Sequence, residues 1–136
     1  ISVVDNRVVS ASFTTANSAL RHNWISALAA VGEEWFAGTY GAGVFRYDGN
    51  QWHSFPTLRE SFEVNPNAMV VTTQAVYAGT LGRGMAVYNR ENGRWAFHTV
   101  GLPSGNVTAL AAQNGWIWVG TDNGLVRIAE RSVARP

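Results

Sequence analysis

The sequence has no cysteine and no lysine, and charged residues of both signs are scarce. Without cysteine, the chain can form no disulfide, no thiolate metal site and no cysteine nucleophile. Charged residues make up 14% of the 136 residues, and the formal net charge is +1. Because binding to nucleic acid or to an anionic membrane depends on clustered positive charge, the composition favours neither partner.

Long apolar runs and helical periodicity are also missing. No apolar run approaches the roughly 20 residues of a membrane-spanning helix, so we expect no membrane span in this chain. No window shows apolar residues sustained at a spacing of about 3.6, which argues against a helical solenoid. No signal peptide is visible and the chain begins at Ile1, so we expect a processed or excised piece, or a sequence without its leader.

What the sequence does contain is a repeat. The dipeptide Gly-Thr occurs at 38–39, 79–80 and 120–121, at two equal intervals of 41 residues. Each occurrence leads into a turn rich in glycine, asparagine or aspartate. A fixed period of this size indicates that each copy is one supersecondary unit.

Each copy consists of short segments rich in β-branched or aromatic residues, separated by turn residues, which is typical of β-strands. The segments are 24–30, 34–39, 43–47 and 51–55, then 67–71, 75–80, 84–88 and 94–100, then 106–112, 116–121 and 124–128. Four short strands in about 40 residues are typical of one blade of a β-propeller. We therefore predict an all-β protein, a β-propeller of four-stranded antiparallel blades.

The third copy contains Asn106-Val-Thr-Ala-Leu110 and Trp116-Ile-Trp-Val-Gly-Thr-Asp-Asn-Gly-Leu125. These residues resemble the two-component regulator propeller repeat, and the resemblance extends over about residues 20–128. That repeat occurs in periplasmic sensor regions of bacterial hybrid histidine kinases and in related free-standing propellers. The resemblance implies a ligand-sensing or protein-interaction domain in signal transduction, with a periplasmic or extracellular location.

We predict one propeller domain or fragment over 1–136, with a half-blade at 1–16, blades at 20–55 and 65–100, and a partial blade at 105–136. At 41 residues a copy, 136 residues give about three blades, whereas known propellers have about four to eight. The ring would therefore be completed by further blades of the same polypeptide or by a second copy. A self-contained small ring is the alternative. The tail from Ala129 is expected to fray or to form a weak fourth strand.

In a propeller, the loops from second to third strand and the loops between blades lie on one face around the axis. Function in repeat folds is usually carried by such loops. The scaffold positions repeat while the loop residues differ, so we expect a ligand site here without favouring one residue. The candidates are His22, Trp24, Tyr40, Arg59, Glu60, Arg83, Asp122 and Asn123, with Arg21 and Asn65 nearby.

The sequence contains no nucleophile elbow, phosphate loop or paired-carboxylate motif, so we predict no enzymatic activity. Its histidines, at 22, 53 and 98, do not have the spacing of a metal site, and we expect neither a metal nor a cofactor. An enzymatic propeller is a third hypothesis, with Asp122 as its one axial candidate.

The six tryptophans support a second hypothesis, a carbohydrate-binding propeller, because aromatic rings stack on sugars. Four of them occupy strand positions where packing between blades is expected to bury them. Trp24 is the exception, because it stands where the third copy has Asn106, at the start of an inner strand. Specific sugar binding that is lost in Trp24→Ala would favour this hypothesis over ligand sensing.

Overall fold

The computed structural model of the chain describes residues 1–55 and 61–134. Within these residues the protein is almost entirely β-structure, in agreement with the predicted fold class. The strands are β1 (Ser2–Asp5), β2 (Val8–Ser12), β3 (Ile25–Val31), β4 (Glu34–Thr39), β5 (Val44–Tyr47), β6 (Trp52–Ser54), β7 (Val64–Val71), β8 (Ala75–Thr80), β9 (Met85–Asn89), β10 (Arg94–His98), β11 (Val107–Gln113), β12 (Trp116–Thr121) and β13 (Gly124–Ala129), and one helix, α1, spans Glu130–Val133.

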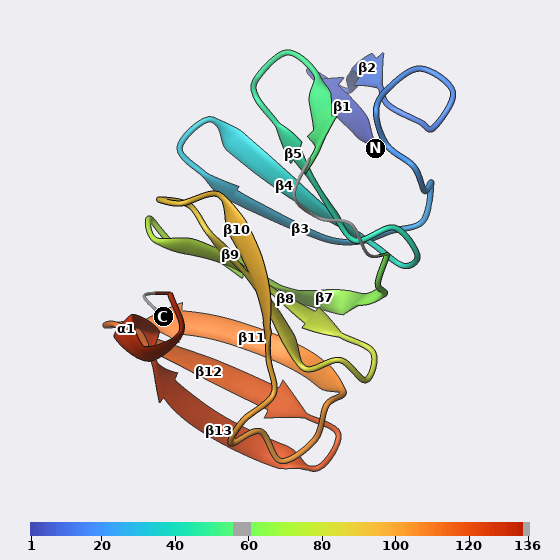
Figure 1. The fold of residues 1–136 in the computed structure, drawn as a ribbon. Coiled ribbons are helices and arrows are strands. Elements are labelled where there is room, and N and C mark those ends of the chain that lie inside the picture. The colour runs from blue at the N-terminus through green and yellow to red at the C-terminus, as the bar shows by residue number, and fades with distance from the viewer. Residues whose placement is uncertain (56–60, 135–136) are drawn as a thin grey trace.

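The strands form antiparallel sheets with the meander order of propeller blades. The first blade is β3-β4-β5-β6 and the second is β7-β8-β9-β10, whereas the third blade has three strands, β11-β12-β13. Figure 1 shows the three sheets stacked one on the next, with the β1–β2 hairpin at one end of the stack. The stack does not close into a ring, and β3, β7 and β11 lie side by side as its inner strands.

The repeated threonine closes the turn between the second and third strands of each blade. The Thr39 hydroxyl donates to the carbonyl of Gly43 at 2.8 Å and accepts the backbone N–H of Ala42 at 2.9 Å. Thr80 makes the same pair of bonds, to Gly84 and Arg83, at 2.7 and 2.9 Å. Thr121 makes the equivalent bonds, to Gly124 and Asn123, at 2.9 and 3.1 Å in a turn that is one residue shorter. Side chains that bond to nearby backbone in this way stabilise turns. We refer to this arrangement as the threonine latch.

The repeated glycine is required for a different reason: the inner strand of the next blade passes close to it. A Cβ added to Gly38 would lie 2.7 Å from Cγ1 of Val64 on β7. At Gly79 it would lie 2.5 Å from the carbonyl oxygen of Val107 on β11. Only glycine leaves room for the neighbouring inner strand at these two positions.

The other glycines of these turns allow the backbone to reverse direction, with one exception. Gly43, Gly82, Gly84 and Gly124 have positive φ, as the tight turns require. Gly41 is not in the positive-φ region. There a Cβ would lie 2.7 Å from the ring of His22, so packing of the imidazole explains the glycine.

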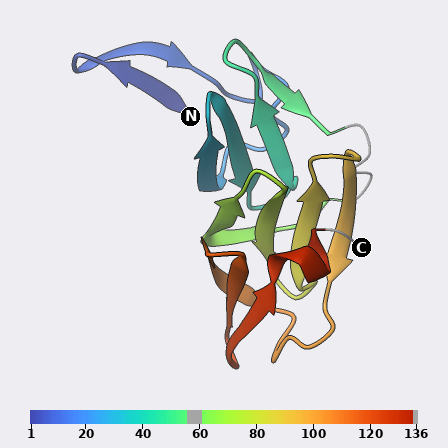
Figure 2. The same cartoon turned by 90° about the vertical axis from the view of Figure 1, so that its left-hand side faces the viewer.

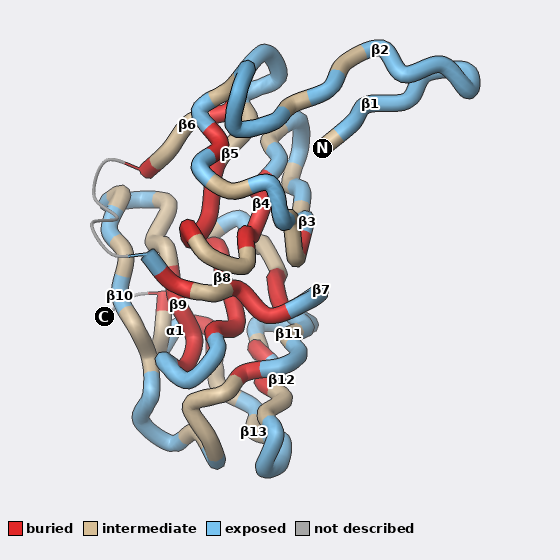
Figure 3. Tube along the Cα trace, turned by 90° about the vertical axis from the view of Figure 1, so that its right-hand side faces the viewer, coloured by how far each residue is buried: buried red, intermediate tan, exposed pale blue. Residues whose placement is uncertain are grey.

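The core lies between the blades. Phe36, Val44, Phe55 and Val76 belong to a cluster between the first and second blades. Tyr77, Met85, Ile117 and Val119 belong to a cluster between the second and third. Figure 3 shows that the buried segments run along the middle of the stack and that exposed segments lie towards both ends. The expected burial of tryptophans is wrong for Trp35 and Trp118, which are 45% and 36% exposed because no blade covers them.

The predicted half-blade at the N-terminus is a hairpin of β1 and β2 that turns at Asn6 and Arg7. Asn6 and Arg7 both have positive φ, at 48° and 66°, which suits a two-residue hairpin turn. Figure 2 shows the hairpin extending away from the first blade. Its base is attached through Phe13, whose ring centroid lies 5.5 Å from that of Tyr47 and 6.4 Å from that of Trp52.

Two segments differ from the prediction. The chain after Ala129 forms neither a frayed end nor a fourth strand over residues 130–133 but the helix α1. Glu130 is buried there, because its Oε2 accepts the Tyr77 hydroxyl at 2.6 Å and the Thr72 hydroxyl at 2.8 Å. The second blade also begins earlier than expected, since β7 starts at Val64, whereas its first strand was predicted over 67–71.

Candidate functional site

One backbone hydrogen bond recurs in all three blades and defines a common surface. The residue after each repeated threonine donates to the chain just before or at the start of the inner strand: Tyr40 to Trp24 at 3.0 Å, Leu81 to Glu63 at 3.2 Å and Asp122 to Asn106 at 3.3 Å. The predicted loops therefore do lie at the same end of the sheets. We call this end the loop face.

In the first blade, the structure brings His22, Trp24 and Tyr40 together. The Trp24 side chain is 59% exposed, and its ring centroid lies 4.6 Å from that of Tyr40. His22 supports this pair, because its Nδ1 accepts the backbone N–H of Trp24 at 3.0 Å. Trp24 and Tyr40 form an exposed aromatic surface, which we call the aromatic platform.

A shallow pocket of about 600 Å³ adjoins the platform. Its lining includes Trp24 together with polar groups from Asn23, Ser26 and Asn67. The Ser26 hydroxyl is buried and has no hydrogen-bond partner within the described part of the chain. The platform thus combines an aromatic ring with polar groups within one hollow.

In the second blade, the candidate Arg83 lies against its own sheet. The guanidinium carbon of Arg83 is 4.1 Å from the ring centroid of Phe97 on β10. This cation–π contact holds the charge near the loop face. Beside it, Leu81 is 45% exposed.

In the third blade, Asp122 and Asn123 are fixed by the loop that precedes β11. Asp122 accepts a hydrogen bond from the Asn106 amide at 3.3 Å, and the Asn123 amide donates to the carbonyl of Pro103 at 3.3 Å. Hydrogen bonds from the side chains of Ser104 and Asn106 hold the pKa of Asp122 below its usual range. This carboxylate is therefore ionised at neutral pH.

Asn65 was placed among the loop candidates, but it is buried. Its amide nitrogen lies 2.6 Å from the carbonyl oxygen of Val107, 2.9 Å from Oδ1 of Asn106 and 3.2 Å from the carbonyl oxygen of Thr80. Asn65 thus connects the second blade to the third. Its role is structural, because a buried amide with these partners is not free to bind a ligand. Arg21 lies over the Phe45 ring at 5.3 Å, while Arg59 and Glu60 lie outside the described residues.

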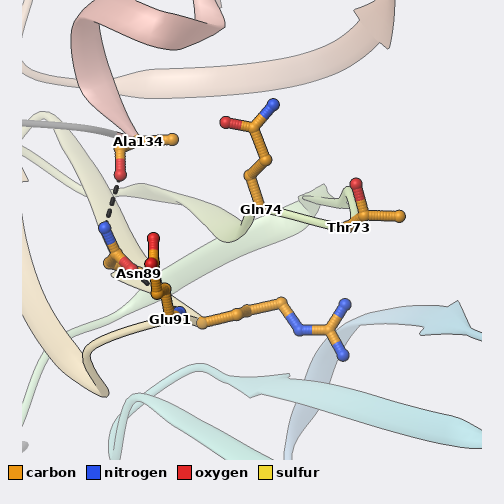
Figure 4. A pocket seen from close by; sticks show the side chains of 6 residues that line it. Thr73, Gln74, Asn89, Glu91 and Ala134 are labelled. Atoms are coloured by element: carbon orange, nitrogen blue, oxygen red, sulfur yellow. Dashed lines mark hydrogen bonds between the residues drawn. The ribbon is translucent and has the colours of Figure 1, made fainter.

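A second pocket, of about 350 Å³, lies at the opposite end of the second blade, and sequence reasoning did not predict it. Figure 4 shows Thr73, Gln74, Asn89 and Glu91 around it, with the Asn89 amide donating to the carbonyl of Ala134. Arg90 also lines this pocket. No sequence signal could have found it, because α1 brings Ala134 there and α1 itself was not predicted.

The histidines show no arrangement for metal binding. Across residues 1–55 and 61–134, no three histidine, aspartate or glutamate side chains are grouped as metal ligands. His53 lies 2.6 Å from the carboxylate of Asp48, in the turn that leads to β6. Backbone hydrogen bonds from Gln51 and Asn50, together with the one to His53, lower the pKa of Asp48. Nor does the described part of the chain hold a helix long and apolar enough to cross a bilayer.

These features define the protein as a propeller-type domain made of stacked antiparallel blades. Residues 101–123 match the family model described as two component regulator propeller. This match lies in the third copy and confirms the resemblance seen in the sequence. It covers the loop before β11, the strands β11 and β12 and the candidates Asp122 and Asn123.

Among solved structures, the chain is similar to one described as the crystal structure of the computationally designed Ika4 protein. The two are 14% identical with a TM-score of 0.44, and the match covers 83% of this chain and 92% of the other. No curated protein matches the chain.

Proposed function

We propose that this propeller-type domain is a non-catalytic binding module that senses a ligand or docks a protein through its loop face. One observation carries the proposal: a recurring threonine latch supports different residues in each blade. The threonine accepts the backbone N–H of Ala42 in the first blade, of Arg83 in the second and of Asn123 in the third. Beside it, the residue that follows each threonine is Tyr40, Leu81 or Asp122. A constant scaffold with variable tips is the arrangement expected of a recognition surface.

The chemistry at the tips supports binding of a mixed polar and aromatic ligand. The first blade contributes the aromatic platform, the second a guanidinium and the third an ionised carboxylate. These groups can stack on, or form hydrogen bonds to, a small molecule or a peptide. The resemblance to the two-component regulator propeller supports a role in signal transduction and a periplasmic or extracellular location.

Three blades provide only part of a ring, so a complete loop face requires more blades. Further blades of the same polypeptide or a second copy of the chain would supply them. The binding partner would then be recognised at the centre of that larger ring.

Thermal shift with a library of amino acids, organic acids, nucleotides and oligosaccharides tests the proposal, because a ligand of the native state raises the melting temperature. A ligand should lose its effect in the Tyr40→Ala, Asp122→Ala double variant. The matched control is Asn50→Ala with Glu91→Ala, which changes two exposed residues in turns at the opposite end of the blades. Loss of the effect only in the control would place the site in the opposite pocket and refute the loop face.

A carbohydrate ligand is the second candidate, and the aromatic platform favours it. Trp24 is highly exposed beside a pocket with polar lining, as sugar-stacking tryptophans require. A glycan array compares the wild type with Trp24→Ala and with Trp35→Ala, the latter being another exposed tryptophan away from the loop face. Specific binding lost only in Trp24→Ala supports carbohydrate recognition, and absence of specific binding contradicts it.

A further inference from the structure

One face of the first blade packs on the second blade, and the same face of the second blade packs on the third. The third blade has the equivalent face. Phe36, Tyr77 and Trp118 stand at equivalent positions, spaced 41 residues apart. Phe36 is 1% exposed and Tyr77 is 0% exposed, because the next blade covers each of them. Trp118 has no such cover and is 36% exposed.

The repeated glycine is a second, independent sign that the third blade has an uncovered face. Gly38 and Gly79 are close to the inner strand of the following blade, where an added Cβ would collide with Val64 or Val107. Gly120 is the equivalent residue, but there a Cβ would meet only Ala109 of its own blade, at 3.2 Å. The third blade therefore retains the space that an adjoining inner strand needs.

The inter-blade asparagine is a third observation. Asn65 reaches across to the carbonyl of Val107 on the next blade, whereas the amide of the equivalent Asn106 reaches Asp122 of its own blade. We call the surface formed by Asn106, Trp118 and Gly120 the third-blade face.

The complementary surface is present at the other end of the same chain. In the interior interfaces, Met69 and Val76 pack back onto the first blade, and Leu110 and Ile117 pack back onto the second. The equivalent residues of the first blade are Leu28 and Trp35, which are 49% and 45% exposed. They line an apolar groove of about 460 Å³ beside the N-terminal hairpin. We call this surface the first-blade face.

Part of the first blade is already covered by the N-terminal segment. Phe13 packs on Tyr47 and Trp52, and Leu20 belongs to the cluster that buries Ala37. Leu28 and Trp35 remain exposed beside β1, which lines the same groove. These two residues are therefore the part of the first-blade face that is available to a docking blade.

We propose that a second copy of this chain docks on the third-blade face through Leu28 and Trp35 of its first blade. The contact repeats the two interfaces already inside the chain, with β11 of one copy beside β3 of the other. Because every chain carries both faces, two copies close a ring through two identical head-to-tail contacts. The ring then has about six blades, within the usual range of about four to eight. This inference does not depend on the proposed ligand function.

Size-exclusion chromatography with light scattering tests the inference without reference to any ligand. The wild type should have about twice the 14.8 kDa mass of one chain. Trp118→Glu and Leu28→Glu should each run as a monomer, because each places a charge in both contacts of the ring. Val100→Glu is the matched control, since Val100 is 82% exposed in a loop away from both faces, and it should remain a dimer. Near-ultraviolet circular dichroism confirms that each variant is folded.

Mixing the two monomeric variants provides the decisive comparison. A mixture of Trp118→Glu and Leu28→Glu retains one intact contact, between the unchanged Trp118 of one chain and the unchanged Leu28 of the other. It should form a heterodimer that is weaker than the wild-type dimer. A mixture that stays monomeric, a wild type that is monomeric at its highest soluble concentration, or a mass that grows without limit would overturn the closed pair.

Discussion

The strands β8 and β12 occupy the same place in successive blades, yet their surroundings differ. All six residues of β8 (Ala75–Thr80) are buried, whereas in β12 (Trp116–Thr121) only Ile117 and Val119 are buried. Both strands have a sheet neighbour on each side, and both pair with the inner strand of their blade in the same register. The pairing of β12 with β13 is shifted by one residue, because the turn between them is one residue shorter. The difference comes from the stack, since β8 has a blade on each face and β12 has one on a single face. Burial in a propeller is thus decided by the neighbouring blade rather than by the strand itself.

The largest expected effect comes from removing the large side chain that faces the next blade. Phe36→Ala should lower the free energy of unfolding by about 3–5 kcal/mol, because it leaves a cavity between two packed sheets. Trp118→Ala should lower it by less than about 1 kcal/mol in dilute protein, since the partly exposed ring has no blade over it. Urea unfolding of both variants measures the difference, and equal losses would contradict the comparison.

Substituting the repeated glycine should give a smaller loss of stability, again larger where a blade covers the residue. Gly79→Ala should cost about 1–3 kcal/mol, because the new methyl group overlaps the backbone of β11. Gly120→Ala should cost less, because its methyl group meets only Ala109 of the same blade, at 3.2 Å, and no backbone of a neighbouring blade. The measurement is urea unfolding at a concentration where the chain is monomeric. A larger loss at Gly120 than at Gly79 would show that the clash is not what the glycine avoids.

Tyr77 sharpens the comparison because its hydroxyl connects the second blade to α1. Tyr77→Phe should cost about 1–3 kcal/mol, since Glu130 loses one of its two hydroxyl donors while remaining buried. Tyr40→Phe on the exposed aromatic platform is the control and should cost less than about 0.5 kcal/mol. Thermal and urea unfolding provide the measurement, and an unchanged stability of Tyr77→Phe would refute a structural role for this bond.

The same residue predicts a loss of stability at alkaline pH. Burial, and next the hydrogen bond to Glu130, raise the pKa of Tyr77 in the folded chain. In the unfolded chain the pKa is about 10, so above this pH the unfolded state loses its proton while the folded state keeps it. The stabilising contribution is therefore complete below about pH 10 and decreases as the pH rises beyond it. Unfolding measured between neutral pH and pH ~11 should show this decrease in the wild type, and Tyr77→Phe should reduce it.

The smallest expected effect is electrostatic and lies on the open third blade. Ser104→Ala should raise the pKa of Asp122 towards its usual range, because Ser104 provides the main hydrogen bond to that carboxylate. Stability should not change measurably, since Asp122 is exposed. Carbon-detected NMR titration of the aspartate side chains measures the shift, with Ser132→Ala as the control. An unchanged Asp122 pKa in Ser104→Ala would remove the hydrogen bond as its cause.

The sequence by itself determined the local parts of this protein: the strands, their hairpins and the 41-residue period. These depend on side-chain type and turn chemistry within one copy, so the hairpin at Asn6 and the positive φ of Gly82 were predictable. The threonine latch is also local, because Thr80 bonds to residues within four positions of itself. Of the candidate site, the common loop face follows from the same period, whereas the grouping of His22, Trp24 and Tyr40 depends on contacts that the period does not give.

Only the tertiary structure decided what lies on either side of each sheet. The identity of Trp118 does not reveal whether a blade covers it, and the sequence gives Asn65 and Asn106 the same role although one is buried between blades. The same holds for Gly41, whose reason is the ring of His22, and for α1, which Tyr77 and Thr72 hold through Glu130. In each case the deciding contact joins separate elements of the chain. Only stacking of the blades supplies such contacts, and the hydrophobic pattern of one strand does not encode them.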